Sequence, residues 1–276
     1  MLIDAEGRLV SAIPVIPGTK HAPHRVPGGM IQHDNVNLEF GITPASSEDE
    51  WVENNGIVIS YCADFLRKSG LRMLVQASAD FPDSELNSLE AKTFGCDPDF
   101  SPYTMSINSV PPGAAEGNLR TCGGHVHIGN DEIAEDIDNQ AEVAKVMDIF
   151  LGIPSMLLDK DPTSPRRREL YGQAGAHRPK SYGVEYRAIG NYWISHPKMT
   201  RLVYRLVRDG LSAYESKLTA GINQKMIRAV INKNMTDKVD GIMQGFVIPL
   251  LAADTRELLS EMLEMPQVDI YEGWKL

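Results

Sequence analysis

Three segments of this chain alternate polar and apolar side chains with a period of two residues, the pattern of a β-strand with one packed face. They are residues 35–42, 119–129 and 183–189. In each segment one face is apolar, and the other carries carboxylate, imidazole or guanidinium groups. The residues that can do chemistry on these faces are Glu39, His125, His127, Glu185 and Arg187. A sheet with a chemically active face is therefore expected.

Segments with helical spacing follow the first strand and dominate the end of the chain. A helix is predicted over residues 47–68, where Ser46 or Ser47 can cap the amino end. A second helix is expected over residues 138–158. Residues 197–263 repeat apolar side chains at helical spacing and are predicted to be mostly helical.

Strands early and helices late favour an α+β fold. No internal repeat, low-complexity tract or Gly/Ser-rich linker divides the chain, so a single domain over residues 1–276 is predicted. The sheet and the motifs fall in residues 8–195, and residues 196–276 form a largely helical part. Residues 79–118 are expected to be loop-rich, and residues 159–178 basic and irregular.

Composition excludes several classes of protein. With 276 residues, 42% of them hydrophobic, the chain can bury a core without disulfide or metal staples. A net charge of −10 disfavours nucleic acid and anionic membranes as partners. No apolar run is long enough to span a membrane, and the first residues do not read as a signal peptide. The odd set Cys62, Cys96 and Cys122 indicates reduced thiols, so a cytoplasmic location is expected.

His125 and His127 lie two residues apart in a predicted strand and so share one face. Gly123 and Gly124 precede them and would let a ligand approach closely. Two imidazoles in this arrangement suit a metal or a phosphate. The alternative is a pair of hydrogen-bonded histidines on a half-exposed strand.

Glu185 and Arg187 also share a strand face. A carboxylate beside a guanidinium can hold Mg²⁺ with one group and a phosphate oxygen with the other. A cross-strand salt bridge is the alternative. Glu39 lies on the polar face of its strand, where it is either a ligand or a solvated side chain.

Residues 165–178 form the most basic stretch of an otherwise acidic chain. Their arginines can chelate phosphate, and their glycines allow backbone N–H groups to approach an anion. Neither the phosphate loop of P-loop proteins nor the glycine motif of Rossmann folds is present. Residues 165–178 are therefore either a phosphate-binding segment of another kind or a solvated loop.

Several motifs occur together and in a fixed order, at residues 38–44, 94–100, 120–129, 171–178 and 183–187. This ordered set resembles the carboxylate–amine ligases related to glutamate–cysteine ligase and glutamine synthetase. Within that group it is most similar to the type 2 ligase family found in some tailed phages. The resemblance covers roughly residues 8–195.

The resemblance implies a curved antiparallel β-sheet around a funnel, like that of glutamine synthetase, with helices packed outside. It implies an ATP-dependent reaction in which a carboxylate attacks the γ-phosphate to give an acyl phosphate and an amine then displaces phosphate to form an amide. Mg²⁺ or Mn²⁺ ions would accompany ATP. The partners would be a small-molecule or peptide carboxylate and an amine, a homo-oligomer is compatible, and a phage-encoded chain would work in the host cytoplasm.

The same resemblance assigns roles to individual residues. Metal binding falls to Glu39, His125 and Glu185. Nucleotide binding falls to His125, His127, Arg168 and Arg178. Catalysis, through charge neutralisation at the transferring phosphate, falls to Arg178 and Arg187.

In one place the chain departs from the family. The family opens with a strand that carries a Gly-x-Asp-Pro-Glu motif, and Met1 stands where that strand should end. At least one metal carboxylate is then absent, so a catalytically inactive nucleotide-binding homologue is one alternative. Another is a metal-dependent hydrolase or oxygenase that uses His125, His127 and a carboxylate. Dependence on a nucleotide separates these readings.

Overall fold

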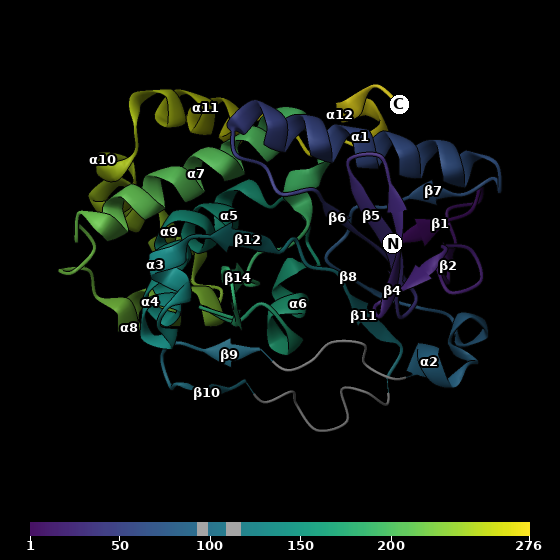
Figure 1. The fold of residues 1–276 in the computed structure, drawn as a ribbon, viewed down its shortest axis with the longest axis horizontal. Coiled ribbons are helices and arrows are strands. Elements are labelled where there is room, and N and C mark those ends of the chain that lie inside the picture. Colours follow the sequence, from purple (N-terminus) through teal and green to yellow (C-terminus); the bar gives the residue numbers. More distant parts are fainter. Residues whose placement is uncertain (93–98, 109–116) are drawn as a thin grey trace.

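The computed structural model of the protein describes residues 1–92, 99–108 and 117–276 (Figure 1). These residues form short antiparallel sheets and helices, and the helices dominate the second half of the chain. The α+β fold class and the largely helical end of the chain are thereby confirmed. Residues 94–98 of the motif at 94–100, including Cys96, lie outside the described residues.

The strands are short. In the first half of the chain they are β1 (Leu2–Ile3), β2 (Leu9–Val10), β3 (Gly18–Thr19), β4 (Ala22–Val26), β5 (Gly29–Asp34), β6 (Asn37–Ile42), β7 (Arg72–Met73) and β8 (Ser78–Asp80). The later ones are β9 (Phe100–Ser101), β10 (Ser106–Ile107), β11 (Leu119–Thr121), β12 (Val126–Gly129), β13 (His177–Lys180) and β14 (Gly183–Tyr186). They pair antiparallel in the orders β2–β1–β7, β3–β4–β5–β6, β11–β8 and β10–β9–β13–β14–β12.

The helices cover the sheets. The α-helices are α1 (Glu48–Arg67), α2 (Leu89–Lys92), α3 (Asp131–Ala134), α4 (Ile137–Met147), α5 (Ile153–Leu158), α6 (Ser164–Leu170), α7 (Pro197–Glu215), α8 (Gln224–Asn232), α9 (Thr236–Ile242), α10 (Ile248–Leu250), α11 (Ala253–Glu264) and α12 (Ile270–Trp274). Two 3-10 turns, η1 (Asp83–Leu86) and η4 (Tyr192–Ser195), and two π-helical turns, η3 (Asp148–Gly152) and η5 (Met243–Val247), complete the set. Figure 1 shows α1, α7 and α11 along one side of the molecule, above β12 and β14.

Among the described residues there are three apolar cores, and the two larger ones lie behind the polar faces. In the larger core, Val126 and Ile128 of β12 and Val184 and Tyr186 of β14 pack with residues of α4, α5 and α7. The second core lies between the β5–β6 hairpin and α1. Its buried members include Ile31, Val58, Ile59, Cys62 and Leu66. Alternation in β6, β12 and β14 thus places one face of each strand in a core, as the sequence predicts.

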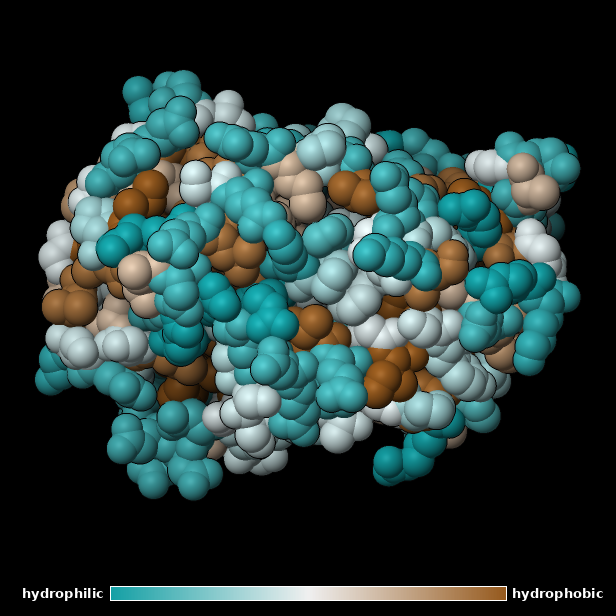
Figure 2. Space-filling model, turned by 90° about the horizontal axis from the view of Figure 1, so that it is seen from above, coloured by the Kyte–Doolittle hydropathy of each residue, from teal (hydrophilic) through white to brown (hydrophobic). Residues whose placement is uncertain are grey.

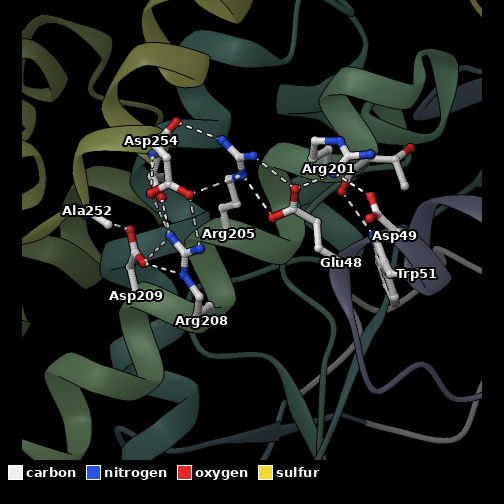
Figure 3. Close-up of polar contacts among 11 residues, drawn as sticks. Glu48, Asp49, Trp51, Arg201, Arg205, Arg208, Asp209, Ala252 and Asp254 are labelled. Atoms are coloured by element: carbon white, nitrogen blue, oxygen red, sulfur yellow. Dashed lines mark hydrogen bonds and ion pairs between the residues drawn. The ribbon is translucent and has the colours of Figure 1, made fainter.

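An ionic network joins α1 to α7 and α11 (Figure 3). Glu48, in the first turn of α1, accepts hydrogen bonds from Arg201 and from Arg205 of α7, the latter at 2.9 Å through Nε to Oε2. Arg208 pairs with both carboxylate oxygens of Asp254 in α11, at 3.1 and 3.0 Å. The network connects the helix of the second core to the helices of the larger one.

The predicted helix at residues 47–68 is confirmed as α1, where the side chain of Ser47 accepts a hydrogen bond from the Glu50 N–H at 3.2 Å. The helix predicted at 138–158 is interrupted by the π-helical turn η3.

Three expectations need correction. Residues 119–129 do not form one strand: residues 122–125 have no regular structure, and β11 and β12 belong to different sheets. The strand predicted at 183–189 ends at Tyr186, and Arg187 follows it. The segment 159–178 is not irregular throughout, because it contains helix α6.

Hydrophilic side chains cover most of the face seen in Figure 2, and hydrophobic ones form small scattered patches. Ile57 of α1, 37% exposed, is one of the large apolar residues at the surface. Among the helices of the described residues, none combines the length and the apolar character needed to cross a bilayer.

Candidate active site

A cavity of about 980 Å³ lies between the β5–β6 hairpin, the segment around β12, and helices α1 and α7. Of the residues predicted as site residues, Glu39, His125, His127 and Arg187 line it. The sequence therefore brings residues from distant parts of the chain to one cavity.

Glu185 lies at the centre of a row of charged residues that crosses three strands. In the antiparallel register, Glu185 of β14 faces His127 of β12 on one side and Arg178 of β13 on the other. Its carboxylate contacts Arg187 Nη1 through Oε1 and accepts a hydrogen bond from Lys180 Nζ at 2.7 Å through Oε2. The distance from Arg178 Nη1 to Oε1 is 3.8 Å.

Glu185 is only 3% exposed, so these cations act on it in a region of low dielectric constant. Burial by itself would raise the pKa of the Glu185 carboxyl. The nearby charge of Arg187, with further contributions from His125 and Lys180, outweighs burial and holds this pKa well below its usual range. Glu185 is therefore ionised at every physiological pH.

Arg187 is held by several partners at once. Its Nε donates to Asp99, which is 5% exposed, and its Nη1 donates to His125 Nδ1 at 3.0 Å. Burial, and then the charge of Arg187, lower the pKa of His125 well below its ordinary value. A neutral His125 that accepts at Nδ1 carries its proton on Nε2, so it can donate to an anion.

His127 faces the rim of the cavity and is exposed. Its Nδ1 lies 2.5 Å from the Tyr182 hydroxyl, and the two rings stack with centroids 6.1 Å apart. Burial of the ring atoms lowers the pKa of His127. This shift favours the neutral imidazole, which can donate one hydrogen bond and accept one.

Glu39 lies on the hairpin wall of the cavity. Its Oε2 accepts a hydrogen bond from Gln32 Nε2 at 2.7 Å, across the β5–β6 register. Burial, and then the charge of Asp34, raise the pKa of the Glu39 carboxyl. A cation bound near Glu39 would relieve this unfavourable environment.

The basic segment contributes a residue that the sequence analysis did not single out. Arg167 lines the cavity and is 3% exposed. It donates to the carbonyls of Ala188 and Arg187 at 2.9 and 3.1 Å. Burial lowers the pKa of Arg167 to about 10, so the guanidinium stays charged. Its neighbour Arg168 is not brought to the cavity and instead donates to Asn234 at 2.7 Å.

Two further residues of the site were missed, although the sequence carried a signal for each. Asp99 belongs to the motif at residues 94–100. Lys180 stands two residues after Arg178 on β13, and the strand period places both side chains on the same face.

The predicted metal ligands do not converge into one site. Among the parts of the chain that the structure describes, no three His, Cys, Asp or Glu side chains are grouped to hold a metal ion. Glu185 is surrounded by cations, and the Nδ1 lone pair of His125 is used by Arg187. Glu39 differs, because its hydrogen-bond partner Gln32 is neutral and its setting favours a nearby cation.

Comparison with known proteins gives one match. The model of the family described as phage phiEco32-like COOH.NH2 ligase-type 2 matches residues 111–264. No curated protein and no solved structure matches. The matched segment is more than half of the chain and contains β12, β13 and β14, which carry the charged row. The chain therefore belongs to the phage phiEco32-like COOH.NH2 ligase-type 2 family.

Proposed function

We propose that this protein is an ATP-dependent ligase that joins a carboxylate to an amine through an acyl-phosphate intermediate. The observation that carries the proposal is positive charge at and next to the cavity: Arg167 and Arg187 are buried in its lining, and Arg178 and Lys180, outside the lining, reach the Glu185 carboxylate. Arg187, Arg178 and Lys180 surround Glu185, and Arg167 lies close by on the cavity wall. Such a group of cations in an acidic chain suits a ligand with several negative charges.

The chemistry requires this charge. In the first step a carboxylate oxygen attacks the γ-phosphorus, and the bond from that phosphorus to the β–γ bridging oxygen breaks, so ADP leaves. Two anions meet in this step, and guanidinium groups offset their repulsion. Arg187 and Arg178 are the residues proposed to neutralise the transferring phosphoryl group, because their planar donor arrays match its oxygens.

In the second step the amine nitrogen bonds to the acyl carbon, the acyl carbon–oxygen bond breaks, and inorganic phosphate leaves as the nitrogen loses its extra proton. His125 and His127 would donate hydrogen bonds to phosphate oxygens. Among the residues of this chain, Glu39 would contact the Mg²⁺ or Mn²⁺ that accompanies ATP, and the bound ion would neutralise part of the triphosphate charge.

Finer features follow from the same proposal. The short antiparallel sheets around the cavity would form the wall of a funnel like that of glutamine synthetase, with the helices outside. Free thiols at Cys62 and Cys122 are consistent with a cytoplasmic location. Small-molecule or peptide carboxylates and amines are the proposed partners, without membrane or nucleic acid.

The test is an assay of ADP release with Mg²⁺ and ATP over a panel of carboxylic acids. Hydroxylamine serves as a general amine, because it converts an acyl phosphate into a hydroxamate that mass spectrometry identifies. We expect acid-dependent ADP release together with a hydroxamate of matching mass. ATP binding without turnover for any acid would favour the inactive homologue, and loss of ATP binding as well would refute the proposal.

Glu185→Gln is the first variant for this assay. It keeps the shape of the side chain but leaves Arg187, Arg178 and Lys180 without their shared counterion, so their positions change. The rate of ADP release should fall by roughly 10²–10³, as for loss of one preorganised electrostatic group. Glu142→Gln is the matched control, because Glu142 pairs with Lys145 on α4 and not with the cations around Glu185. Equal rates for both variants and the wild type would remove Glu185 from the site.

A further inference from the structure

The end of the cavity formed by α1 and α7 is a separate binding surface with a chemistry of its own. We propose that it receives the side chain of the carboxylate substrate, and that this substrate is an acid with an aromatic or large apolar group. The inference rests on the proposed ligase function and adds the class of acid that the site accepts.

Three aromatic rings build this surface. Trp51 of α1 stacks on Trp193 with ring centroids 5.6 Å apart and an interplanar angle of 21°. Tyr204 of α7 lies against Trp51, with centroids 6.4 Å apart. All three residues line the cavity. We call Trp51, Trp193 and Tyr204 the aromatic wall.

The indole N–H groups of the aromatic wall are already used. Trp51 Nε1 donates to the Thr200 carbonyl at 2.9 Å, and Trp193 Nε1 donates to the Gly124 carbonyl at 3.3 Å. A ligand that reaches the two indoles therefore meets ring surface rather than their hydrogen-bond donors. Such a surface favours an apolar or flat group.

The aromatic wall is held rigidly in place. Figure 3 shows Trp51 beside the ion pairs that fasten the first turn of α1 to α7. There Glu48 and Asp49 bind Arg201, the latter at 2.9 Å. A rigid aromatic surface binds an apolar group without a large ordering cost.

The wall lies next to the reacting end of the cavity. At Gly123 an added Cβ would stand 2.6 Å from His125 Nε2 and 2.8 Å from Arg167 Nη2. At Gly124, the next residue, an added Cβ would stand 2.2 Å from Trp193 Nε1. Consecutive Cα atoms are 3.8 Å apart. Arg167 and Trp193 line the same cavity as these two glycines, so a carboxylate bound near Arg167 shares the cavity with the indoles.

Much of the rest of this surface is apolar, beside the amide of Asn55 of α1. Val203 and Val207 of α7, Ile194, and Phe40 and Ile42 of β6 line the same cavity. Within the described lining, the cationic side chains are Arg120, Arg167 and Arg187, and none of them comes from α1 or α7. A second carboxylate placed at the aromatic wall would lose its hydration without gaining a cation there. Dicarboxylic acids such as glutamate are therefore disfavoured.

The volume agrees with this division of the cavity. About 980 Å³ stands at the upper end of the range for small-molecule sites, so a nucleotide and a second molecule with a bulky side chain can be held together. The adenine ring of ATP is the competing occupant of the aromatic wall.

The experiment compares acids of one series in the hydroxylamine assay: acetate, glutarate and 3-phenylpropionate. It compares wild type with Tyr204→Leu, and uses Tyr214→Leu as the matched control. Tyr214 is a partly buried tyrosine of the same helix that lies outside the cavity lining. Calorimetric titration of each acid, and of ATP with Mg²⁺, gives the binding affinities separately from turnover.

We expect 3-phenylpropionate to give the highest kcat/KM of the three acids. Tyr204→Leu should lower its affinity by about 10-fold, as for one lost aromatic contact of roughly 1.4 kcal/mol, and leave the ATP affinity unchanged. Equal preference for glutarate, or an affinity for ATP that falls instead, would overturn the inference. Binding of 3-phenylpropionate that depends on Tyr204 without turnover would support the surface and refute the ligase proposal alone.

Discussion

At Arg178, the effect of the positive charge on catalysis can be tested separately from the effect of the guanidinium geometry. Arg178 stands opposite Glu185 in the β13–β14 register, and its Nη1 lies 3.8 Å from the Glu185 carboxylate, beyond a good hydrogen bond. Arg187, in contrast, contacts that carboxylate directly. Arg178 thus contacts the Glu185 carboxylate less closely than Arg187 does.

We predict that Arg178→Lys lowers kcat by roughly 10-fold or more and changes the affinity for ATP less. Lysine keeps the charge but loses the two-pronged contact, which should strengthen as the phosphoryl group transfers. Steady-state kinetics of ADP release measure both quantities. Arg166→Lys, which alters an exposed pair with Asp80, is the control and should be silent. An unchanged kcat in the Arg178 variant would exclude this role.

A second residue has consequences for stability rather than for catalysis. Asp148, fully buried in the π-helical turn η3, accepts hydrogen bonds from the Tyr103 and Tyr186 hydroxyls and from the Gly175 N–H, each at 2.7 Å. Burial raises the pKa of this carboxyl to about 6, although the three donors lower it. In the unfolded chain the carboxyl ionises near its ordinary value of 3.8.

The folded state therefore holds this proton more tightly than the unfolded state does. Its contribution to stability is fully present below the ordinary pKa and is lost as the pH rises towards 6. Asp148→Asn cannot ionise, so between pH 4 and 6 the wild type should lose up to roughly 3 kcal/mol of unfolding free energy relative to the variant. Urea denaturation across this range measures it. A constant difference between the two proteins would contradict the shift.

At the scale of elements, the strand break at Gly123–Gly124 shapes the cavity, because both glycines are part of its lining. It separates β11 from β12 and passes the backbone between two sheets. Gly124 fits closely there, because a Cβ would lie 2.2 Å from Trp193 Nε1 and 2.5 Å from the Gly190 carbonyl oxygen. Backbone and an anchored indole cannot both yield, so a methyl group has no room.

We predict that Gly124→Ala lowers the unfolding free energy by about 1–3 kcal/mol, the usual cost of overpacking, and disturbs the tryptophan fluorescence. Gly129→Ala is the matched control on β12, since the nearest atom to its added Cβ is 3.7 Å away. Chemical denaturation of both variants gives the comparison. Equal stability would mean that the chain at this break can relax.

Period and spacing predicted the elements better than their ends. The apolar faces of β6, β12 and β14 and the cap of α1 follow from local pattern alone. The break at Gly123–Gly124 does not follow from local pattern, because the alternation of polar and apolar residues continues through it. Only the approach of Trp193, which is 69 residues after Gly124, requires the break. Helix α6 was missed because its three arginines were interpreted as a loop.

Part of the candidate site was also predictable from the sequence. Glu39, His125, His127 and Arg187 could be chosen because strand period and motif both indicated them. Arg167 and Arg168 could not be distinguished from sequence, since neighbouring helix positions point in different directions and only packing shows which one meets the cavity. Burial of Glu185 among cations depends on Lys180 and Arg178 of another strand, and its carboxylate also lies 3.4 Å from His125 Nδ1.

At the scale of the whole molecule, the ion pairs of Glu48 join helix α1 of the second core to helix α7 of the larger core. Glu48 is 19% exposed at its side chain, as is Arg205, so water screens this pair only in part. Burial of Glu48 opposes its ionisation less than Arg205 and Arg201 favour it, and its pKa is lowered. The two cores should therefore unfold together.

We predict a single calorimetric transition for the wild type, and for Glu48→Gln a loss of about 1–2 kcal/mol in unfolding free energy. Asp64→Asn is the control on the same helix: its pair with Arg67 is exposed, so the change should be nearly silent. Two separate transitions in the wild type would show that the cores are independent units and would contradict the single domain.

The Glu185 carboxylate, the shared counterion of Arg187, Arg178 and Lys180, has a consequence for selectivity by valence. Because Glu185 already neutralises part of the charge of Arg187, Arg178 and Lys180, an incoming anion must exchange places with it rather than fill a vacancy. Chloride or acetate offers these cations less charge than the carboxylate gives them at contact distance. A triphosphate can engage several of them at once while Glu185 keeps a partner. We therefore expect a polyvalent ligand, but not the small monovalent ions of the cell, to displace Glu185 from these cations.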